Sequence, residues 1–351
     1  MPDSYAGKRI LITGGTGSFG HTVTSQLLAR DVAEVRVFSR DEAKQDLMRS
    51  EIADSRVRFY LGDVRDFSSV ERATTDVDFV FHAAALKQVP SCEFFPMEAV
   101  RTNIVGSENV VRAAEVCGVS SLVCLSTDKA VYPVNAMGMT KAMMEKVARS
   151  HGLNNPNAET IVSCVRYGNV MYSRGSVIPL FIRQLQAGHH LTVTNPGMTR
   201  FMMSLADSVD LVEFAFHNAR QGDLFIRKAK ACTVGDLAQA VINLFHSPAL
   251  IDVIGTRHAE KVSEALASRE ELARAQDLGD YFRIRADNRD LNYSVYVEEG
   301  NLTQAQFEDY DSHTVEQMSV TEIERLLLTL PEVRAELAAA GLPAERGEIE
   351  L

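Results

Sequence analysis

Near the N-terminus the chain reads Arg9-Ile-Leu-Ile-Thr13-Gly14-Gly-Thr-Gly-Ser-Phe-Gly20, and an amphipathic segment follows from Val23 to Arg30. An apolar strand, a glycine-rich turn and a helix in this order let backbone N–H groups approach a pyrophosphate at the helix N-terminus. The glycines are spaced Gly-x-x-Gly-x-x-Gly, not Gly-x-Gly-x-x-Gly, but strand and helix lie where such a turn requires them. The stretch favours dinucleotide binding over a merely tight turn, with contacts from Gly14, Thr16, Gly17, Ser18, Phe19 and Gly20.

Strands and helices alternate along the first half of the chain. After the first strand, apolar runs predict strands at 34–38, 57–61, 78–81, 122–125 and 160–166. Helical patterns separate them, and the longest runs from Met97 to Cys117. The alternation predicts an α/β fold with a Rossmann-like doubly wound parallel sheet over residues 1–170, to which some later segments return.

Beyond residue 170 the pattern changes. We expect an apolar helix at 180–187, a loop-rich stretch at 191–200, a helix at 204–218, an extended segment at 223–226, and a helix at 233–245 capped by Thr233. These pieces predict a smaller α/β substrate-binding lobe over residues 171–276. We expect residues 277–351 to form a C-terminal extension. No clear helix or strand is predicted at 281–285 or 289–293, whereas a helix is predicted at 321–337, before an acidic end.

Composition limits the function classes. The 351 residues carry a formal charge of −11, which argues against a protein that binds nucleic-acid phosphates. Five cysteines without CxxC spacing fit reduced thiols, and neither a secretory leader nor a spanning apolar segment is recognisable, so we expect a cytoplasmic protein without membrane insertion. His189-His190 and His258-x-Glu260 lack further ligands nearby, so no metal site is expected.

The tip of the second strand bears on the choice of dinucleotide. NAD enzymes usually place an acidic residue there for the ribose 2′-hydroxyl, whereas this tip reads Ser39-Arg40-Asp41, with Lys44 one turn on. A guanidinium suits a 2′-phosphate, so NADP is favoured over NAD. Asp41 keeps NAD open, and Arg40 could instead be a solvated residue at a helix start.

The ends of the next strands supply further cofactor candidates. Asp63-Val64 could bond the adenine edge, or Asp63 could cap a helix from Arg65 onward. Three small residues, Ala83, Ala84 and Ala85, allow close approach to a cofactor, and Lys87 is then poised over a ligand or is a surface lysine. His82 is expected to be packed at the edge of the core. Asn103, inside an apolar helical pattern, needs hydrogen-bond partners and could tie its helix to nearby loops.

The chemistry is expected between Ser126 and Lys141. Leu122–Leu125 predicts a buried strand, so Thr127, Asp128 and Lys129 lie at its carboxyl end, where open α/β sheets place reactive groups. Lys141 follows on a helix, on the same face as Met137. The alternative is a strand end with solvated charges.

These features resemble the extended short-chain dehydrogenase/reductase superfamily, whose usual catalytic pair is Tyr-x-x-x-Lys; this chain has Met137-x-x-x-Lys141. Longer motifs resemble the inverting UDP-N-acetylglucosamine 4,6-dehydratases, and the methionine points to their capsule and O-antigen branch, which also epimerises C5. The motifs are Phe38-Ser-Arg-Asp-Glu42, Ala83-Ala-Ala-Leu-Lys-Gln-Val-Pro90, Ser126-Thr-Asp-Lys-Ala130, Asn135-Ala-Met-Gly-Met-Thr-Lys-Ala-Met-Met-Glu-Lys146, Arg166-Tyr-Gly-Asn169, Arg174-Gly-Ser-Val-Ile-Pro179, Met198-Thr-Arg-Phe201 and Gly255-Thr-Arg-His258.

The resemblance implies a redox-neutral cycle with tightly bound, recycled NADP. A hydride leaves C4 of the sugar, Lys129 takes the proton from C5, and Asp128 protonates the C6 hydroxyl so that water leaves. The hydride returns to C6, and a proton returns to C5 on the opposite face. A free lysine has a pKa of about 10.4, so a base near pH 7 needs that pKa lowered by about 3, on the order of 4 kcal/mol. Burial, the nicotinamide charge and Lys141 act in that direction, and Asp128 acts against it.

A methionine at position 137 has no acidic proton, so it cannot take the C4 hydroxyl proton. Lys129 then accepts both the C4 hydroxyl proton and the C5 proton, or water or Thr127 relays the C4 hydroxyl proton. The resemblance also implies further contacts. Those to cofactor include Lys87, Asn103, Lys141 and Tyr167; those to UDP-N-acetylglucosamine are Lys87, Ser126, Thr127, Asn169, Val177, Arg200, Arg257 and Glu260.

It further implies a homo-oligomer, a dimer or a hexamer, with the C-terminal extension as a segment that wraps a partner subunit. Two rival functions remain beside the dehydratase. One is a nucleotide-sugar C4 epimerase, against which the Asp128-Lys129 pair and the missing tyrosine argue. The other is a non-catalytic NADP-binding protein.

Overall fold

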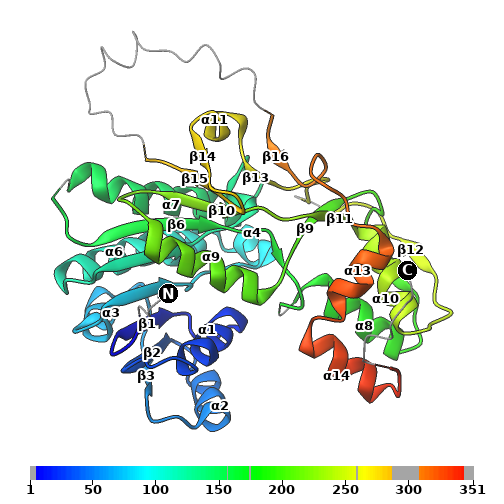
Figure 1. Ribbon diagram of the computed structural model, residues 1–351, viewed down its shortest axis with the longest axis horizontal. Coiled ribbons are helices and arrows are strands. Elements are labelled where there is room, and N and C mark those ends of the chain that lie inside the picture. The colour runs from blue at the N-terminus through cyan, green and yellow to red at the C-terminus, as the bar shows by residue number, and fades with distance from the viewer. Residues whose placement is uncertain (1–4, 156, 174, 258–259, 287–307, 344–351) are drawn as a thin grey trace. The chain divides into compact units, whose positions relative to one another are not determined.

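A computed structural model describes residues 5–155, 157–173, 175–257, 260–286 and 308–343. They fall into two compact units, each assembled from three stretches of chain (Figure 1). The first unit comprises Met1–Tyr167, Ala206–Lys228 and Leu266–Asp309, and the second unit comprises Gly168–Leu205, Ala229–Ala265 and Tyr310–Leu351. The lobe expected over residues 171–276 is therefore not one body, because residues 206–228 and 266–276 belong to the first unit.

A nine-stranded sheet forms the centre of the first unit, in the order β14-β15-β10-β6-β5-β4-β1-β2-β3. Every pairing from β3 to β10 is parallel, and β15 is antiparallel to both β10 and β14. The order 3-2-1-4-5-6 confirms the predicted doubly wound fold. The strands are β1 (Arg9–Thr13), β2 (Glu34–Ser39), β3 (Val57–Leu61), β4 (Phe79–His82), β5 (Ser121–Leu125), β6 (Ile161–Arg166), β10 (Leu224–Arg227), β14 (Ala275–Asp277) and β15 (Tyr281–Ile284).

One sequence-based prediction about the late strands was wrong, and another was confirmed as a strand but lies in a different unit from the one expected. Residues 281–285 have an element, since β15 pairs along the full length of β10. The segment at 223–226 is extended as predicted, but it joins the main sheet beside β6. Tyr281-Phe-Arg-Ile mixes polar and apolar residues, which fits an antiparallel strand near a sheet edge. Residues 289–293 and the acidic end lie outside the described residues.

Helices of the first unit follow the strands as expected, with one interruption. The predicted helix over 97–117 is divided: α5 leads into a π-helical segment, η1 (Val100–Val105), before α6. The first helix begins at Ser18, directly after the glycine turn, and not at Val23. The helices are α1 (Ser18–Leu28), α2 (Glu42–Ile52), α3 (Phe67–Thr74), α4 (Val89–Phe94), α5 (Pro96–Ala99), α6 (Gly106–Val116), the 3-10 turn η2 (Asp128–Ala130), α7 (Ala136–Asn154), α9 (Leu205–Asn218) and α11 (Arg269–Leu272).

The first unit has a core of strand residues covered on one side by α1 and α9. Ile10, Val123, Val165 and Phe225 come from four different strands and are fully buried in one cluster. Parallel strands covered on both faces need such continuous apolar runs, which is why the strand predictions were accurate.

The second unit is built around small sheets, β11-β9-β7 and β12-β8. The stretch at 191–200, predicted to be loop-rich, contains β8 and the start of β9. The predicted helix over 321–337 is two helices, because Pro331 lacks an N–H and starts a new one. The elements are β7 (Asn169–Val170), α8 (Val177–Gln186), β8 (Leu191–Val193), β9 (Thr199–Met203), β11 (Ala231–Thr233), α10 (Val234–Leu244), β12 (Ile251–Val253), β16 (Tyr310–Asp311), α13 (Val320–Leu327) and α14 (Pro331–Ala339). The chain passes from the second unit to the first within β13 (Ala265–Ala267).

The second unit has its own core. Phe181 of α8, Val241 of α10 and Ile323 of α13 are buried in one cluster. Thr233 caps α10 as predicted, since its side chain accepts a hydrogen bond from the Asp236 N–H. In neither unit do the described residues include a helix with the length and apolar character that a membrane crossing requires.

Candidate active site

The glycine turn lies between β1 and α1, and its glycines are required by close backbone contacts. Gly14 has φ +66°, and a Cβ there would lie 2.8 Å from the backbone of Ala84. A Cβ at Gly20 would lie 2.1 Å from the Gly15 carbonyl oxygen. Gly17 is the N-cap of α1 and supplies no side-chain hydrogen bond. The turn therefore leaves backbone N–H groups at a helix N-terminus, which suits a phosphate.

The carboxyl end of β2 brings several predicted cofactor residues together. Thr16 Oγ1 lies 2.9 Å from Ser39 Oγ. The guanidinium of Arg40, 53% exposed, lies 3.7 Å from Asp63. Asp41 caps α2 by accepting a hydrogen bond from the Lys44 N–H, and its carboxylate pairs with the Lys44 ammonium. The exposed cation at this tip is thus Arg40, while Asp41 has a structural role in α2.

Asp63 does not have the alternative role of capping the next helix. Helix α3 begins at Phe67, and its N-cap is Asp66, which accepts a hydrogen bond from Ser69 N. The Asp63 carboxylate instead pairs with Arg65 at 2.7 Å. Burial opposes ionisation of Asp63, but hydrogen bonds from Arg65 and the nearby Arg40 charge lower its pKa.

Beyond β4, polar residues tie the loops together. His82 is 1% exposed, with Nδ1 2.7 Å from Thr13 Oγ1 and Nε2 2.8 Å from Ser107 Oγ. Burial and the charge of Lys141 lower its pKa to about 3. His82 is therefore a packed, neutral histidine, as predicted.

Asn103 has the hydrogen-bond partners that a buried amide needs. Its side chain accepts a hydrogen bond from Leu86 N at 2.8 Å and donates to Leu86 O and Thr140 Oγ1, both at 3.0 Å. It links η1, the loop after β4 and α7, which confirms its predicted tie. Val64 is buried, Ala83, Ala84 and Ala85 are half-buried, and Lys87 is exposed just after the fixed Leu86.

The carboxyl end of β5 gathers the predicted catalytic groups. Asp128 is 0% exposed and accepts hydrogen bonds from Thr127 Oγ1 at 2.6 Å and Lys129 N at 2.9 Å. The Lys129 ammonium, with a side chain 24% exposed, lies 3.1 and 3.3 Å from the two Asp128 oxygens. The turn forms because Thr127 caps η2. A buried carboxyl and a partly exposed amine can exchange a proton directly at this distance.

Lys141 and Met137 have different surroundings, although they lie one turn apart on α7. The buried Lys141 ammonium donates to Leu125 O at 2.7 Å, and burial lowers its pKa. Met137 packs in a small apolar cluster with Cys92 and Ala99. Tyr167 accepts the Asp128 N–H at its carbonyl oxygen, 3.1 Å away, and burial together with the Asp128 charge raises the pKa of its phenol.

Within the part of the chain that the structure describes, the buried hydroxyl of Ser126 has no hydrogen-bond partner, which suits a ligand beside this group. An orphaned donor at a strand end, a glycine cradle and an exposed arginine at the tip of β2 fit a dinucleotide phosphate and sugar. The residues present therefore fit the cofactor that the sequence predicts.

The predicted substrate residues Asn169, Val177, Arg200, Arg257 and Glu260 all lie in the second unit. The Arg200 guanidinium donates to Thr199 O at 2.7 Å and Lys261 O at 3.0 Å, and lies 3.9 Å from Glu260. Glu260 also accepts the Arg257 N–H at 3.2 Å. These three residues are brought together, whereas Asn169 begins β7 and Val177 begins α8.

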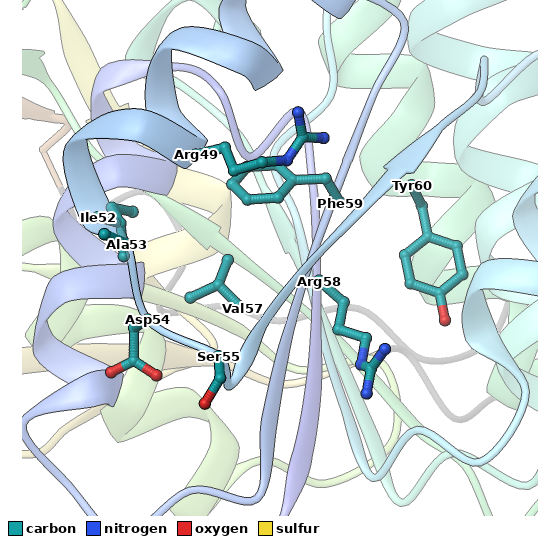
Figure 2. A pocket seen from close by; sticks show the side chains of 9 residues that line it. All are labelled: Arg49, Ile52, Ala53, Asp54, Ser55, Val57, Arg58, Phe59 and Tyr60. Carbon is teal, nitrogen blue, oxygen red and sulfur yellow. The ribbon is translucent and has the colours of Figure 1, made fainter.

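A separate hollow lies at the start of β3 and contains none of the predicted site residues. Figure 2 shows two arginines, Arg49 and Arg58, around its apolar wall. The Arg49 guanidinium lies 4.9 Å from the centre of the Phe59 ring. Among the described residues, no group of three or more His, Cys, Asp or Glu side chains is arranged to hold a metal ion.

Sequence reasoning missed Tyr132 and the buried group around Arg166. Tyr132 has φ +45° and bonds to Asp309, 177 positions away. Arg166 forms ion pairs with Glu145 and Glu271, each at 2.6 Å. The Tyr132-Pro133 pair was a local signal of a constrained turn, but no local pattern points to these distant partners.

Comparisons with known proteins give consistent matches over most of the chain. A sequence model described as "Polysaccharide biosynthesis protein" matches residues 10–286, and one described as "Polysaccharide biosynthesis protein C-terminal" matches residues 287–334. A Rickettsia bellii protein named UDP-glucose 4-epimerase is 53% identical over 340 residues, which is 96% of this chain and 100% of that protein. A Rickettsia prowazekii protein of the same name is 52% identical over the same coverage.

Solved structures agree with the fold. Pen from Bacillus thuringiensis superposes with a TM-score of 0.84 and 36% identity, covering 93% of this chain and 99% of that one. DesIV, a dTDP-glucose 4,6-dehydratase from Streptomyces venezuelae solved with NAD and TYD, has a TM-score of 0.65 and 22% identity over 72% of this chain and 86% of its own. At that identity the second likeness concerns the fold alone.

Proposed function

Because the chain belongs to the polysaccharide biosynthesis protein family, we propose that it is an NADP-dependent, C5-inverting UDP-N-acetylglucosamine 4,6-dehydratase. The product would be the 4-keto-6-deoxy sugar with inverted C5, a first step toward UDP-N-acetyl-L-fucosamine for capsule or O-antigen. One observation carries the proposal: a buried carboxyl and an amine, Asp128 and Lys129, lie in contact at the end of β5.

Two groups are what a dehydration needs. Removal of water across C5 and C6 requires a base for the C5 proton and an acid for the C6 hydroxyl, whereas C4 epimerisation needs only one group for the C4 hydroxyl proton. Lys129 is suited to the first role and Asp128 to the second. The proton count closes, because the two protons that leave O4 and C5 equal those delivered to the departing hydroxyl and to C5. The 3.1 Å contact lets Lys129 pass a proton to Asp128 between steps.

The first proton has no tyrosine to receive it. Met137 offers only a thioether, so the O4 proton goes to Lys129 directly, or it is relayed by water or by the hydroxyl of Thr127. Because that hydroxyl donates to Asp128 at 2.6 Å, a relay through Thr127 delivers the proton to Asp128.

The chain's own residues provide the cofactor and substrate contacts. Bound NADP would supply the hydride acceptor at C4 and the donor at C6. The turn at Gly14–Gly20 and Ser39 would hold its phosphates and ribose, Arg40 would pair with the 2′-phosphate, and Asp63 would bond the adenine edge. In the second unit, Arg200 and Arg257 suit a diphosphate, and Glu260 a ribose hydroxyl.

Further contacts come from the resemblance. Lys87, Ser126, Asn169 and Val177 would lie along the sugar, while Lys141 and Tyr167 would lie against the nicotinamide half of the cofactor. We also propose a cytoplasmic homo-oligomer, a dimer or a hexamer. Size-exclusion chromatography with light scattering tests the assembly.

A second candidate, a nucleotide-sugar C4 epimerase, is favoured by the name of the relatives that share 53% and 52% of their residues. A third, a non-catalytic NADP-binding protein, is favoured by the thioether at position 137. One experiment separates the three: purified protein is incubated with UDP-N-acetylglucosamine in deuterated water. Loss of water with deuterium at C5 supports the dehydratase. Retained mass with a galacto product supports the epimerase, and no turnover supports the third.

Replacement of the proposed base tests the mechanism. Lys129→Ala is expected to lower turnover at least a thousandfold while NADP stays bound, because no other amine contacts Asp128 among the described residues. Lys146→Ala, on the exposed side of α7, is the matched control and should turn over normally. A Lys129→Ala enzyme that works at near wild-type rate would remove the assigned base.

The cofactor assignment has its own test. Arg40→Ala is expected to weaken NADP binding about tenfold or more and NAD binding less than twofold, since only NADP carries the 2′-phosphate. Isothermal titration with both dinucleotides measures this. Equal losses for the two cofactors would contradict the assignment.

A further inference from the structure

The loop between η2 and α7 carries a strained residue next to the proposed base. Tyr132 has φ +45°, a region that side chains other than glycine rarely adopt. It also precedes Pro133, which pushes the residue before it toward extended conformations. Such a conformation persists only where surrounding contacts fix it.

Those contacts are made at the phenol and not by burial of the ring. Tyr132 is 49% exposed, but its hydroxyl lies 3.1 Å from Asp309 Oδ1 and 3.4 Å from Glu270 Oε2. Asp309 also accepts the Arg269 N–H at 2.7 Å. Burial and Asp309 raise the pKa of the phenol, so it stays protonated and donates.

One acceptor, Glu270, lies on a turn that is itself held firmly, and the other, Asp309, is bound to that turn through the Arg269 N–H. Helix α11 is closed by a capping box between Ser268 and Glu271. Glu271 also pairs with the buried Arg166 through two oxygens, at 2.6 and 2.9 Å. Bidentate pairing of this kind fixes geometry as well as charge. The phenol of Tyr132 is therefore tied to a rigid support.

On its other side the Lys129 backbone rests on α7. A Cβ at Gly138 would lie 2.2 Å from the Lys129 carbonyl oxygen, so the first turn of α7 lies directly against that peptide. Asn135 caps α7 through Gly138 N at 2.9 Å, which fixes where the loop must end. The Lys129 peptide thus lies between the first turn of α7 and the turn at Tyr132.

We propose that Tyr132 is a positioning residue for Lys129: its phenol, bound to Asp309 and Glu270, holds the strained loop so that the Lys129 amine stays at Asp128. The kinetic consequence rests on the proposed function, but the placement of the amine does not. Loss of the hydroxyl lets the loop relax to ordinary backbone angles, which draws Lys129 away from Asp128.

Tyr132→Phe keeps the ring and removes the anchor. It is expected to lower kcat at least tenfold, with KM for UDP-N-acetylglucosamine and Kd for NADP changed less than twofold. Asp309→Asn, which weakens the acceptor without altering the loop sequence, should lose activity in the same direction. Unchanged kcat in Tyr132→Phe and Asp309→Asn would overturn the proposal.

A matched pair of glycines separates positioning from general destabilisation. Gly138→Ala and Gly152→Ala lie in the same helix, and their added Cβ atoms would meet neighbours at 2.2 and 2.0 Å. The first meets the Lys129 backbone, while the second meets the Gln221 side chain. Both are expected to lower the melting temperature, but only Gly138→Ala should lower kcat more than tenfold. Equal kcat losses would indicate a merely structural effect.

A measurement that does not depend on turnover tests the position of Lys129 independently of the proposed function. Acylation of Lys129 in the NADP-bound enzyme is followed across pH by mass spectrometry. In Tyr132→Phe the midpoint of Lys129 labelling should shift to lower pH, because an ammonium that leaves a carboxylate loses stabilisation. If Lys129→Ala is active and this shift occurs, the proposed mechanism fails and the positioning stands. An unshifted midpoint overturns the positioning.

Discussion

Buried polar residues of the first unit differ in whether the protein itself supplies their hydrogen-bond partners. His82 has a protein partner on each ring nitrogen, and Asp128 accepts from Thr127 and Lys129, so both are stable without a ligand. The Ser126 hydroxyl has no hydrogen-bond partner among the residues that the structure describes. Since a buried, unpaired hydroxyl is unfavourable, this residue marks where a ligand oxygen is expected. The proposed chemistry therefore depends on the few side chains that follow the end of β5.

His82 gives the fold a sensitivity to acid. Its pKa is about 3 in the folded protein and about 6.5 in an unfolded chain, so the unfolded state binds the extra proton between those values. Stability attributable to His82 is complete above about pH 6.5 and is lost as pH falls toward 3. Between pH 7 and 5 the loss is about 2 kcal/mol.

Urea unfolding of the wild type and His82→Gln at both pH values measures this contribution. The amide does not titrate, so the variant should lose about 2 kcal/mol less than the wild type over that interval. Other titrating groups act equally in both proteins and cancel in the difference. An equal loss in both would contradict a buried, neutral His82.

The interrupted helix of the first unit is the clearest feature at the scale of elements. Residues 97–117 have a helical pattern throughout, yet Val100–Val105 is a π-helix between α5 and α6. The extra residue per turn places Asn103 toward Leu86 and Thr140, which fixes the loop before Lys87 against α7. Such π segments are frequent at functional sites.

Asn103→Ala is expected to lower the free energy of unfolding by about 2–3 kcal/mol, because three hydrogen bonds are lost and the Leu86 N–H is left unpaired. Asn109→Ala on α6 is the control. The Asn109 side chain donates a hydrogen bond to Val64 O at 2.9 Å, and the loss of this bond should lower the free energy of unfolding by about 1 kcal/mol. Urea titration compares the two variants, and equal costs would show that η1 does not depend on Asn103.

At the scale of the whole molecule, each unit is assembled from separated stretches of chain. The first unit includes β10, β15 and α11, which come later in the sequence than residues of the second unit (Figure 1). Arg166 illustrates the dependence, since it pairs with Glu145 from α7 and with Glu271 from α11. Removing one partner from such a buried group costs about 3–5 kcal/mol.

A fragment of residues 1–167 is therefore expected to unfold at a lower urea concentration, and less cooperatively, than the intact chain. It keeps the glycine turn but exposes β6 as an edge and removes Glu271 from Arg166. A fragment of residues 1–228 restores β10 beside β6 and should recover part of the midpoint. Near-ultraviolet circular dichroism follows both. Equal midpoints for the short fragment and the intact chain would contradict this account.

The sequence alone determined the doubly wound sheet, the glycine turn, the Thr233 cap and the adjacency of Asp128 and Lys129. Each follows from apolar periodicity or turn chemistry within a dozen residues. The tertiary structure alone decided that residues 206–228 belong to the first unit and that β10 joins the main sheet beside β6. It also decided that Tyr132 meets Asp309. Contacts between residues far apart in the chain depend on how whole elements pack, and no local pattern of residues records that packing.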